Sequence, residues 1–474
     1  MPKIRQVYLL DPQQLTPETI AVTFAKTSRS PESFRDIASE LSTEKSAEFH
    51  EKWVVGYGHS SVAEHAVLHI AVENISRLAV ECLESNRLAS YTEKSTRYQK
   101  WDQESFYIPA ELNNQKLKKA YIDTNTLLFK TYQESLPVVQ NEIAKQNPRK
   151  ENESEAGWER RIRSLYVDVS RFLLPASSLA NVGMTINARA LEHAIRKMLS
   201  HPLDEVKKIG EEIKLVSKTN VPTLVKYADL VPYWVKTAQN FETVSKKVKS
   251  HSDVKNWCQL VSYDLETEKK VIAGLLYRFS NSDFQSILNY INSSSPMELE
   301  SLVKLSMDKI EKFDIPPREL EYSYFTFDIM MDQGAFFEIK RHRMMTQTAQ
   351  SLTTSLGYAV PKCISLAGFE KEYHLAMKKA DEAYQFIAEY YPDVASYVVP
   401  NAYNRRVLLH ANLRSLDHLI SLRSAPNAHF SVRRIVHKMA EEIVTVSPLT
   451  RFWLRETQDE TWQDVENKYF TSTN

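Results

Sequence analysis

The pattern of apolar and polar positions runs through the same order of elements twice along the chain. In the first half, Val7–Leu10 predicts a short strand and Pro17–Lys26 predicts an amphipathic helix. Residues 261–265 and 268–277 repeat this order in the second half. The pattern therefore indicates that the chain is duplicated.

A partner strand is predicted in each half. It covers residues 66–72 in the first copy and 322–329 in the second, where Phe325, Phe327 and Ile329 alternate with other residues. Alternation of this kind places every second side chain on one face, so we expect a sheet with one buried face.

Helical periodicity dominates the remaining segments. Residues 366–391 and 432–446 are periodic with few breakers and predict helices, whereas the polar stretch 141–159 predicts a surface loop. The junction between the copies is expected near residues 239–253. We predict an α+β fold of two tandem repeats, residues 1–240 and 241–474, each a small sheet with many helices.

Two spacing agreements support the duplication. The turns that start at Ser85 and at Arg341 each have a serine ten residues later, and their numbers differ by 256. Proline and asparagine are twelve residues apart both in Pro175–Asn187 and in Pro400–Asn412. Chance rarely gives two such agreements in the same order, so we interpret these segments as equivalent parts of two repeats.

Composition narrows the classes of function. Sixty basic residues balance sixty acidic ones, which argues against a general nucleic-acid binder and favours a small phosphorylated ligand. Only nine of 474 residues are glycine, so glycine-rich phosphate loops are nearly excluded and arginine side chains must do much of the work of holding any phosphate. No apolar stretch approaches the ~20 residues of a membrane helix, and the apolar run near Met1 is too short for a signal peptide. We expect a soluble, cytoplasmic protein with no membrane contact.

The cysteines and histidines give little sign of a metal. Cys82, Cys258 and Cys363 lack zinc or redox spacing and are expected to be buried thiols. His59 and His65 flank Glu64, but a third ligand with recognisable spacing is missing, so we predict no metal site.

Arg341-His342-Arg343 followed by Ser351 resembles part of the signature of the flavin-dependent thymidylate synthases. The first repeat has the complementary part, Arg87 through Arg97, but replaces the leading Arg-His by Ser85-Asn86. Residues 58–65 and 187–193 resemble two further elements of the family, and residues 412–423 match the stretch that ends in its catalytic arginine. Each repeat thus keeps the part of the pattern that the other has lost.

The resemblance implies an FAD-dependent enzyme that methylates dUMP to dTMP with NADPH and methylenetetrahydrofolate as co-substrates. Arg423 would lie against the pyrimidine as the catalytic residue, and His59 is the candidate nearest the folate. The residues that would contact FAD are Ser61, Arg341, His342, Arg343, Asn412, Arg414 and His418. The residues that would hold dUMP are Glu93, Ser95, Arg97 and Arg171.

Family members are homotetramers with sites shared between subunits, so the resemblance implies a homodimer of this chain that forms a pseudo-tetramer. Simpler interpretations of the same residues stay open. Arg-His-Arg also suits a solvated helix end, residues 59–64 suit a turn and helix cap, and Arg171 and Arg189 suit structural ion pairs. Because neither repeat has a complete signature, a non-catalytic flavin or nucleotide binder, or an interaction protein with the same fold, is the alternative function.

Overall fold

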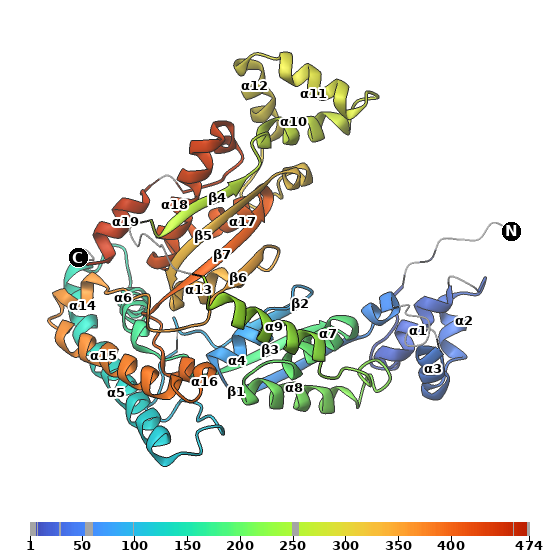
Figure 1. Ribbon diagram of the computed structural model, residues 1–474. Helices are drawn as coiled ribbons and strands as arrows, with labels where there is room; N and C mark the ends of the chain where they lie inside the picture. Colours follow the sequence, from blue (N-terminus) through green and yellow to red (C-terminus); the bar gives the residue numbers. More distant parts are fainter. Residues whose placement is uncertain are drawn as a thin grey trace. The chain divides into compact units, whose positions relative to one another are not determined.

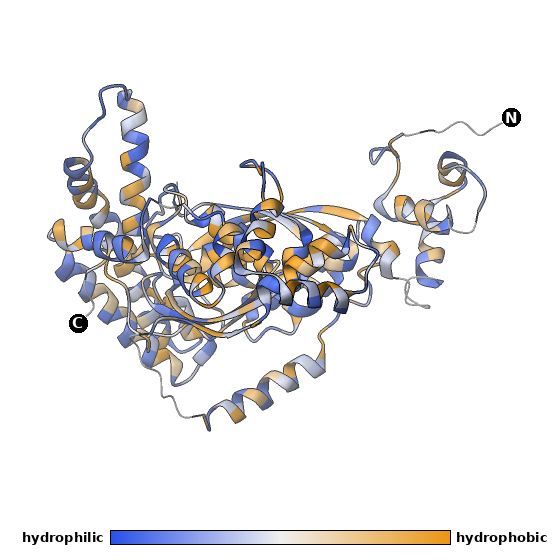
Figure 2. Ribbon diagram, turned by 90° about the horizontal axis from the view of Figure 1, so that it is seen from above, coloured by the Kyte–Doolittle hydropathy of each residue, from blue (hydrophilic) through white to orange (hydrophobic). Residues whose placement is uncertain are grey.

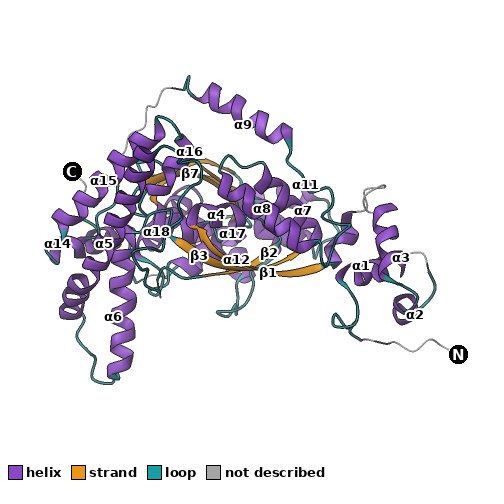
Figure 3. Ribbon diagram, turned by 90° about the horizontal axis from the view of Figure 1, so that it is seen from below, coloured by secondary structure: helices purple, strands orange, loops and turns teal. Residues whose placement is uncertain are grey.

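The computed structural model describes residues 6, 8–27, 30–52, 60–97, 99–248, 256–457 and 459–471. Helix is far more abundant than strand in these residues (Figure 3). The chain divides into two compact units. Unit 1 comprises residues 1–94, 107–113 and 178–250, and unit 2 comprises residues 95–106, 114–177 and 251–474.

Unit 1 has an antiparallel sheet in the order β1-β3-β2, formed by Val67–Ser76, Leu179–Asn187 and Ala89–Glu93. Its helices are α1 (Pro17–Thr27), α2 (Phe34–Ser39), α3 (Thr43–Phe49), η2 (Ser60–His65), α4 (Arg77–Leu83), α7 (Ala188–Leu199), α8 (Asp204–Ser217) and α9 (Pro232–Ser245).

Unit 2 has an antiparallel sheet in the order β4-β5-β7-β6, formed by Cys258–Tyr263, Tyr324–Asp332, Asn404–Asn412 and Thr346–Ala349 (Figure 1). Its first helices come from the first half of the chain: α5 (Gln115–Gln146), α6 (Glu155–Ser170) and η3 (Arg171–Leu173). The others are α10 (Thr267–Tyr277), α11 (Phe284–Ser293), α12 (Pro296–Ser306), η4 (Arg318–Tyr322), α13 (Gln333–Ile339), α14 (Lys362–Leu366), α15 (Glu370–Ala388), α16 (Pro392–Ala395), η5 (Ser396–Val398), α17 (Leu413–Arg423), α18 (Phe430–Val446), η6 (Pro448–Phe452) and α19 (Trp462–Tyr469).

The two sheets share one connectivity. In unit 1 the chain runs β1-α4-β2 and later β3-α7, and in unit 2 it runs β5-α13-β6 and later β7-α17. The register is equivalent as well, since Val67 pairs with Asn187 and Tyr324 pairs with Asn412. The fold is therefore α+β with two copies of one small-sheet arrangement, as predicted, and unit 2 adds the edge strand β4.

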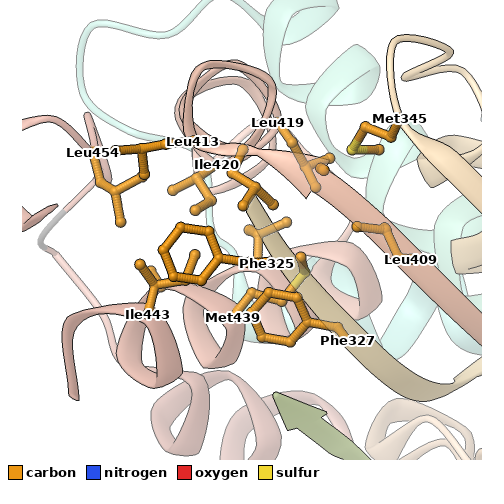
Figure 4. Close-up of a cluster of buried hydrophobic side chains, with 14 of the residues drawn as sticks. Phe325, Phe327, Met345, Leu409, Leu413, Leu419, Ile420, Met439, Ile443 and Leu454 are labelled. Carbon is orange, nitrogen blue, oxygen red and sulfur yellow. The ribbon is translucent and has the colours of Figure 1, made fainter. Parts of the chain in front are cut away.

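Part of the core of unit 2 lies between one face of its sheet and the helices that follow β7. Phe325 and Phe327 of β5 are fully buried against side chains of α17 and α18, such as Ile420 and Met439 (Figure 4). Burying a large apolar side chain contributes about 1.5–3 kcal/mol, so this contact fixes α17 on the sheet. The last residue of α17 is Arg423, which the core thereby holds in place.

Most elements predicted from periodicity are confirmed, with two corrections. Tyr8–Leu10 form no strand, and Val7 is outside the described residues. Most of the expected loop at 141–159 is helical, because α5 continues to Gln146 and α6 begins at Glu155. Both helices bury apolar residues despite their polar composition, and helices throughout carry hydrophilic and hydrophobic residues together (Figure 2).

The repeat boundary stays a prediction, because residues 249–255 are outside the described part of the chain. Among the described residues, every helix is too short or too polar to pass through a lipid bilayer.

Candidate functional site

The Arg-His-Arg segment forms the turn between α13 and β6. His342 is buried, Arg341 is exposed and Arg343 is half-buried. The backbone of this turn is closed locally, since the His342 N–H donates to the Ile339 carbonyl at 3.0 Å and Gln347 Nε2 donates to the His342 carbonyl at 2.9 Å. The turn is therefore a fixed part of the fold and not a frayed helix end.

Arg423, at the end of α17, contacts both this turn and α13 through its guanidinium. Its Nε donates to His342 Nε2 at 3.1 Å, and its Nη1 donates to Glu338 Oε2 at 3.0 Å. Every residue of α13 is buried, and Glu338 presents a carboxylate in a helix whose other residues after Gln333 are all apolar.

Glu338 joins the two halves of the chain, because its other oxygen accepts from Arg171 Nη2 at 3.0 Å. Close by in the sequence, Asp168 accepts a two-pronged contact from Arg97, with Nε at 2.8 Å and Nη2 at 2.7 Å. We call the five residues Arg97, Asp168, Arg171, Glu338 and Arg423 the charge cluster. All five belong to unit 2, although three come from the first half of the sequence.

Burial and the neighbouring arginines change the pKa of both acidic residues of the charge cluster. Burial would raise the pKa of Glu338, but the charges of Arg171, Arg97 and Arg423 outweigh burial and lower it. Burial raises the pKa of Asp168, which the hydrogen bonds and charge of Arg97 offset only in part. Three guanidinium groups face two carboxylates, so positive charge is in excess and favours an anionic ligand.

Two buried histidines border the cluster. Burial, together with the charges of Arg423, His418, Arg341 and Arg343, lowers the pKa of His342 to about 3. Burial also holds the pKa of His429 well below its usual value, and the His429 ring lies 3.2 Å from the Asp168 carbonyl. Both rings are neutral at pH 7, so neither adds positive charge to the cluster.

Among the residues predicted to hold dUMP, Arg97 and Arg171 lie in the charge cluster with Arg423. Ser95 accepts a hydrogen bond from the Arg97 backbone N–H at 3.2 Å and shapes that turn. Glu93 lies in unit 1, where its buried carboxylate pairs with Arg77.

The residues predicted to contact FAD divide between the units. In unit 2, the His418 ring lies 5.5 Å from the His342 ring, and Arg414 donates to Glu321 at 2.8 Å. Asn412 is the N-cap of α17, since its side chain accepts from the Ser415 N–H at 2.8 Å. Ser61 is exposed on η2 of unit 1, and His59 is outside the described residues.

The equivalent turn of the first repeat retains one of these contacts with different side chains. Counting by the offset of 256, Asn86 stands where the second repeat has His342, and Cys82 stands where it has Glu338. Asn86 accepts from Lys197 Nζ at 2.8 Å. Lys197 directly precedes Met198, which is equivalent to Arg423 when positions are counted from the paired residues Asn187 and Asn412. Arg189, in contrast, forms an exposed pair with Glu64.

Sequence reasoning missed Glu338, Asp168 and His429. The available signal was a single acidic residue, Glu338, within the apolar segment 334–339 just before the Arg-His-Arg turn. An unpaired buried carboxylate is costly, so such a residue predicts a cationic partner. Nothing in the sequence identifies that partner as Arg171, which is 167 positions away.

Comparison with known proteins assigns the family. The sequence model of the family described as thymidylate synthase complementing protein matches residues 10–223 and again residues 260–449. The chain belongs to the thymidylate synthase complementing protein family. The double match agrees with the two copies of the fold and confirms the resemblance found in the sequence.

Relatives of this family differ in length. A UPF0159 protein of Chlamydia muridarum is 32% identical over 433 residues, covering 88% of this chain and 82% of the relative. A flavin-dependent thymidylate synthase of Clostridium tetani is 28% identical over 215 residues, covering 45% of this chain and 82% of the relative. The first spans both repeats, whereas the second matches less than half of the chain.

Similarity to solved structures is weak. The crystal structure of the flavin-dependent thymidylate synthase ThyX of Helicobacter pylori, complexed with FAD and dUMP, aligns with 42% of this chain and 97% of its own. The sequence identity is 20% and the TM-score is 0.30.

Proposed function

We propose that this protein is a flavin-dependent thymidylate synthase that converts dUMP to dTMP, with FAD, NADPH and methylenetetrahydrofolate. The observation that carries the proposal is the charge cluster, in which Arg97 and Arg171 of the first repeat and Arg423 of the second pair with Asp168 and Glu338. Family membership and the name of the Clostridium tetani relative support the same activity.

The arginines suit a nucleotide monophosphate. Guanidinium forks match phosphate oxygens, and each charge-assisted contact contributes about 1.5–3 kcal/mol. In this proposal Arg97 and Arg171 hold the phosphate end of dUMP, and Arg423 faces the pyrimidine. There it stabilises negative charge on the ring when N3 loses its proton.

The donors near His342 suit the FAD pyrophosphate. Arg341 and Arg343 lie on the turn that contacts α17, and Arg414 and His418 lie on α17 itself. Cationic side chains of this kind bind phosphate oxygens without a glycine-rich loop, in keeping with the low glycine content. FAD, when bound, would carry the hydride taken from NADPH.

We further propose that each chain has one such site. Exchanging the repeats gives the positions of a second site. Asp393 keeps the carboxylate of Asp168 there, whereas Arg97, Arg171, Glu338 and Arg423 are replaced by Thr353, Ser396, Cys82 and Met198. None of these four can replace an arginine or a carboxylate. Selection on a single composite site explains why the losses in the two repeats are complementary.

Formation of dTMP tests the proposal directly. The purified protein is supplied with FAD, NADPH, methylenetetrahydrofolate and dUMP, and each component is omitted in turn. We expect product only when all four are present. Absence of product despite bound flavin and dUMP would instead support the non-catalytic binder.

The phosphate assignment has its own test. Replacing Arg97 by alanine should weaken dUMP binding by about tenfold or more, because a charge-assisted contact is lost. Isothermal titration measures this affinity, and a variant with unaltered affinity would contradict the composite site.

A further inference from the structure

The side chain that fixes Arg423 is His342. Arginine has only donors, so His342 Nε2 must accept the hydrogen bond from Arg423 Nε and cannot itself be protonated. Two further contacts hold the same guanidinium, from Nη1 to the Glu338 carboxylate at 3.0 Å and from Nη2 to the Glu338 carbonyl at 3.4 Å. Without His342, the guanidinium would be held at its outer nitrogens alone and could pivot on Glu338.

The surroundings keep the ring in the accepting form. His342 is buried, and Arg341, Arg343, Arg423 and His418 face it as positive or potentially positive groups. Burial and these charges lower the pKa of His342 to about 3, so the neutral ring persists through the physiological range.

The first repeat supplies an independent observation. At the position equivalent to His342, Asn86 also presents an acceptor, and it binds the cationic Lys197 at 2.8 Å. Arginine, glutamate and histidine have all been replaced in that repeat, yet an acceptor is retained for a cation near the end of α7, the helix equivalent to α17. The acceptor function of this position is thus separable from the imidazole ring and from the chemistry of the second repeat.

We propose that His342 is a positioning residue for Arg423, acting as a neutral hydrogen-bond acceptor that orients the guanidinium towards the pyrimidine. This role is additional to the FAD contact implied by the family resemblance. The ligand in this inference, dUMP, rests on the proposed function, whereas the contact between His342 and Arg423 rests on the geometry alone.

A double-mutant cycle tests the role. Affinity for dUMP is measured by titration of FAD-saturated protein for the wild type, His342→Leu, Arg423→Ala and the double variant. His342→Leu should weaken dUMP binding about tenfold when Arg423 is present, the usual effect of losing a hydrogen bond to a charged group. In the Arg423→Ala background the same change should have less than about a twofold effect.

Two variants serve as controls. His342→Asn retains an acceptor, as Asn86 does, and should restore most of the affinity. His374→Leu removes a partly exposed histidine of α15 and should leave the affinity unchanged. Equal effects of His342→Leu in both backgrounds would overturn the positioning role and favour a direct ligand contact.

The contact itself is measured without any ligand. Urea unfolding of the same four proteins should show non-additive shifts of the unfolding midpoint, because the two side chains interact. If the shifts are non-additive but the wild type does not bind dUMP, the proposed function fails, whereas the contact between His342 and Arg423 is supported. If the shifts are additive, the positioning role fails whether or not dUMP binds.

Discussion

At the scale of single residues, the charge cluster consists of charged side chains that are mostly buried. Glu338 is 4% exposed and binds two arginines, so its removal would leave the buried guanidinium groups of Arg171 and Arg423 without their shared carboxylate. Such losses cost about 3–5 kcal/mol in other proteins. Substitutions here therefore need separate readouts for stability and for function.

Replacing Arg423 by alanine should lower the turnover number by roughly 10²–10³, the usual effect of removing one preorganised charge stabiliser. FAD binding should persist, because Arg341, Arg343 and His418 are retained. Steady-state kinetics of dTMP formation and flavin absorbance measure the two quantities.

The matched control is Arg406→Ala, which removes a partly exposed arginine paired with Asp328 on the sheet. Its turnover should equal that of the wild type. Unchanged turnover in Arg423→Ala would remove the catalytic assignment.

The buried histidines predict a dependence of stability on pH. His342 has its pKa lowered from 6.5 to about 3, and the pKa of His429 is also well below 6.5. The unfolded chain therefore binds protons below pH 6.5 that the folded chain does not. The free energy of unfolding should fall as the pH is lowered through this range, with a slope that approaches about 1.4 kcal/mol per pH unit for each histidine.

Urea unfolding at pH 7.0, 6.0 and 5.5 checks this slope. The variant His342→Asn lacks this titrating group. Its free energy of unfolding should therefore fall less steeply on acidification, by about the slope expected for one histidine. A slope identical to that of the wild type would mean that His342 titrates normally in the folded protein.

At the scale of elements, helix caps explain some of the residues that look functional. Asn187 and Asn412 occupy equivalent positions, and each caps the helix that follows, α7 or α17. The asparagine of the Asn-x-Arg pattern in both repeats therefore has a structural cause, whatever ligand the second repeat binds.

Replacing Asn187 or Asn412 by alanine should lower the free energy of unfolding by about 1 kcal/mol in each case, because an N-cap hydrogen bond is lost. Aspartate at the same positions should preserve stability, since its carboxylate also caps a helix. Chemical denaturation measures these changes. Flavin titration of Asn412→Asp and Asn412→Ala then separates the cap from the predicted FAD contact: equal loss of FAD affinity in both would favour direct contact.

The sequence predicted elements where one periodicity was strong, as in α1, α10, α15 and α18. It failed for the polar ends of α5 and α6, because tertiary packing of a few apolar residues stabilises helix that local composition does not indicate. In the site, the family pattern predicted that Arg97, Arg171 and Arg423 contact one ligand, which stays a prediction, and the structure brings the three arginines into the charge cluster. Local motifs could not reveal that Glu338 joins them, since that contact depends on the tertiary fold.

At the scale of the whole molecule, two copies of a sheet coexist with one set of cluster charges. Equilibrium titration with dUMP should give one nucleotide per chain, because the exchanged set of positions lacks arginine and glutamate. Calorimetric stoichiometry near two would show that the second set also binds nucleotide. The homodimer expected from the family stays a prediction, and sedimentation at twice the mass of one chain would support it.

The composition of unit 2 has a consequence for synthesis. Residues 95–106 and 114–177 belong to a compact body whose sheet strand β7 ends only at Asn412. On the ribosome, α5 and α6 emerge more than two hundred residues before that strand is complete. Until then, the apolar side chains that these helices bury in the folded protein lack part of their packing partners. The nascent chain should therefore depend on chaperones over this interval. A chain truncated at the repeat junction should be insoluble and should not fold as an independent first repeat.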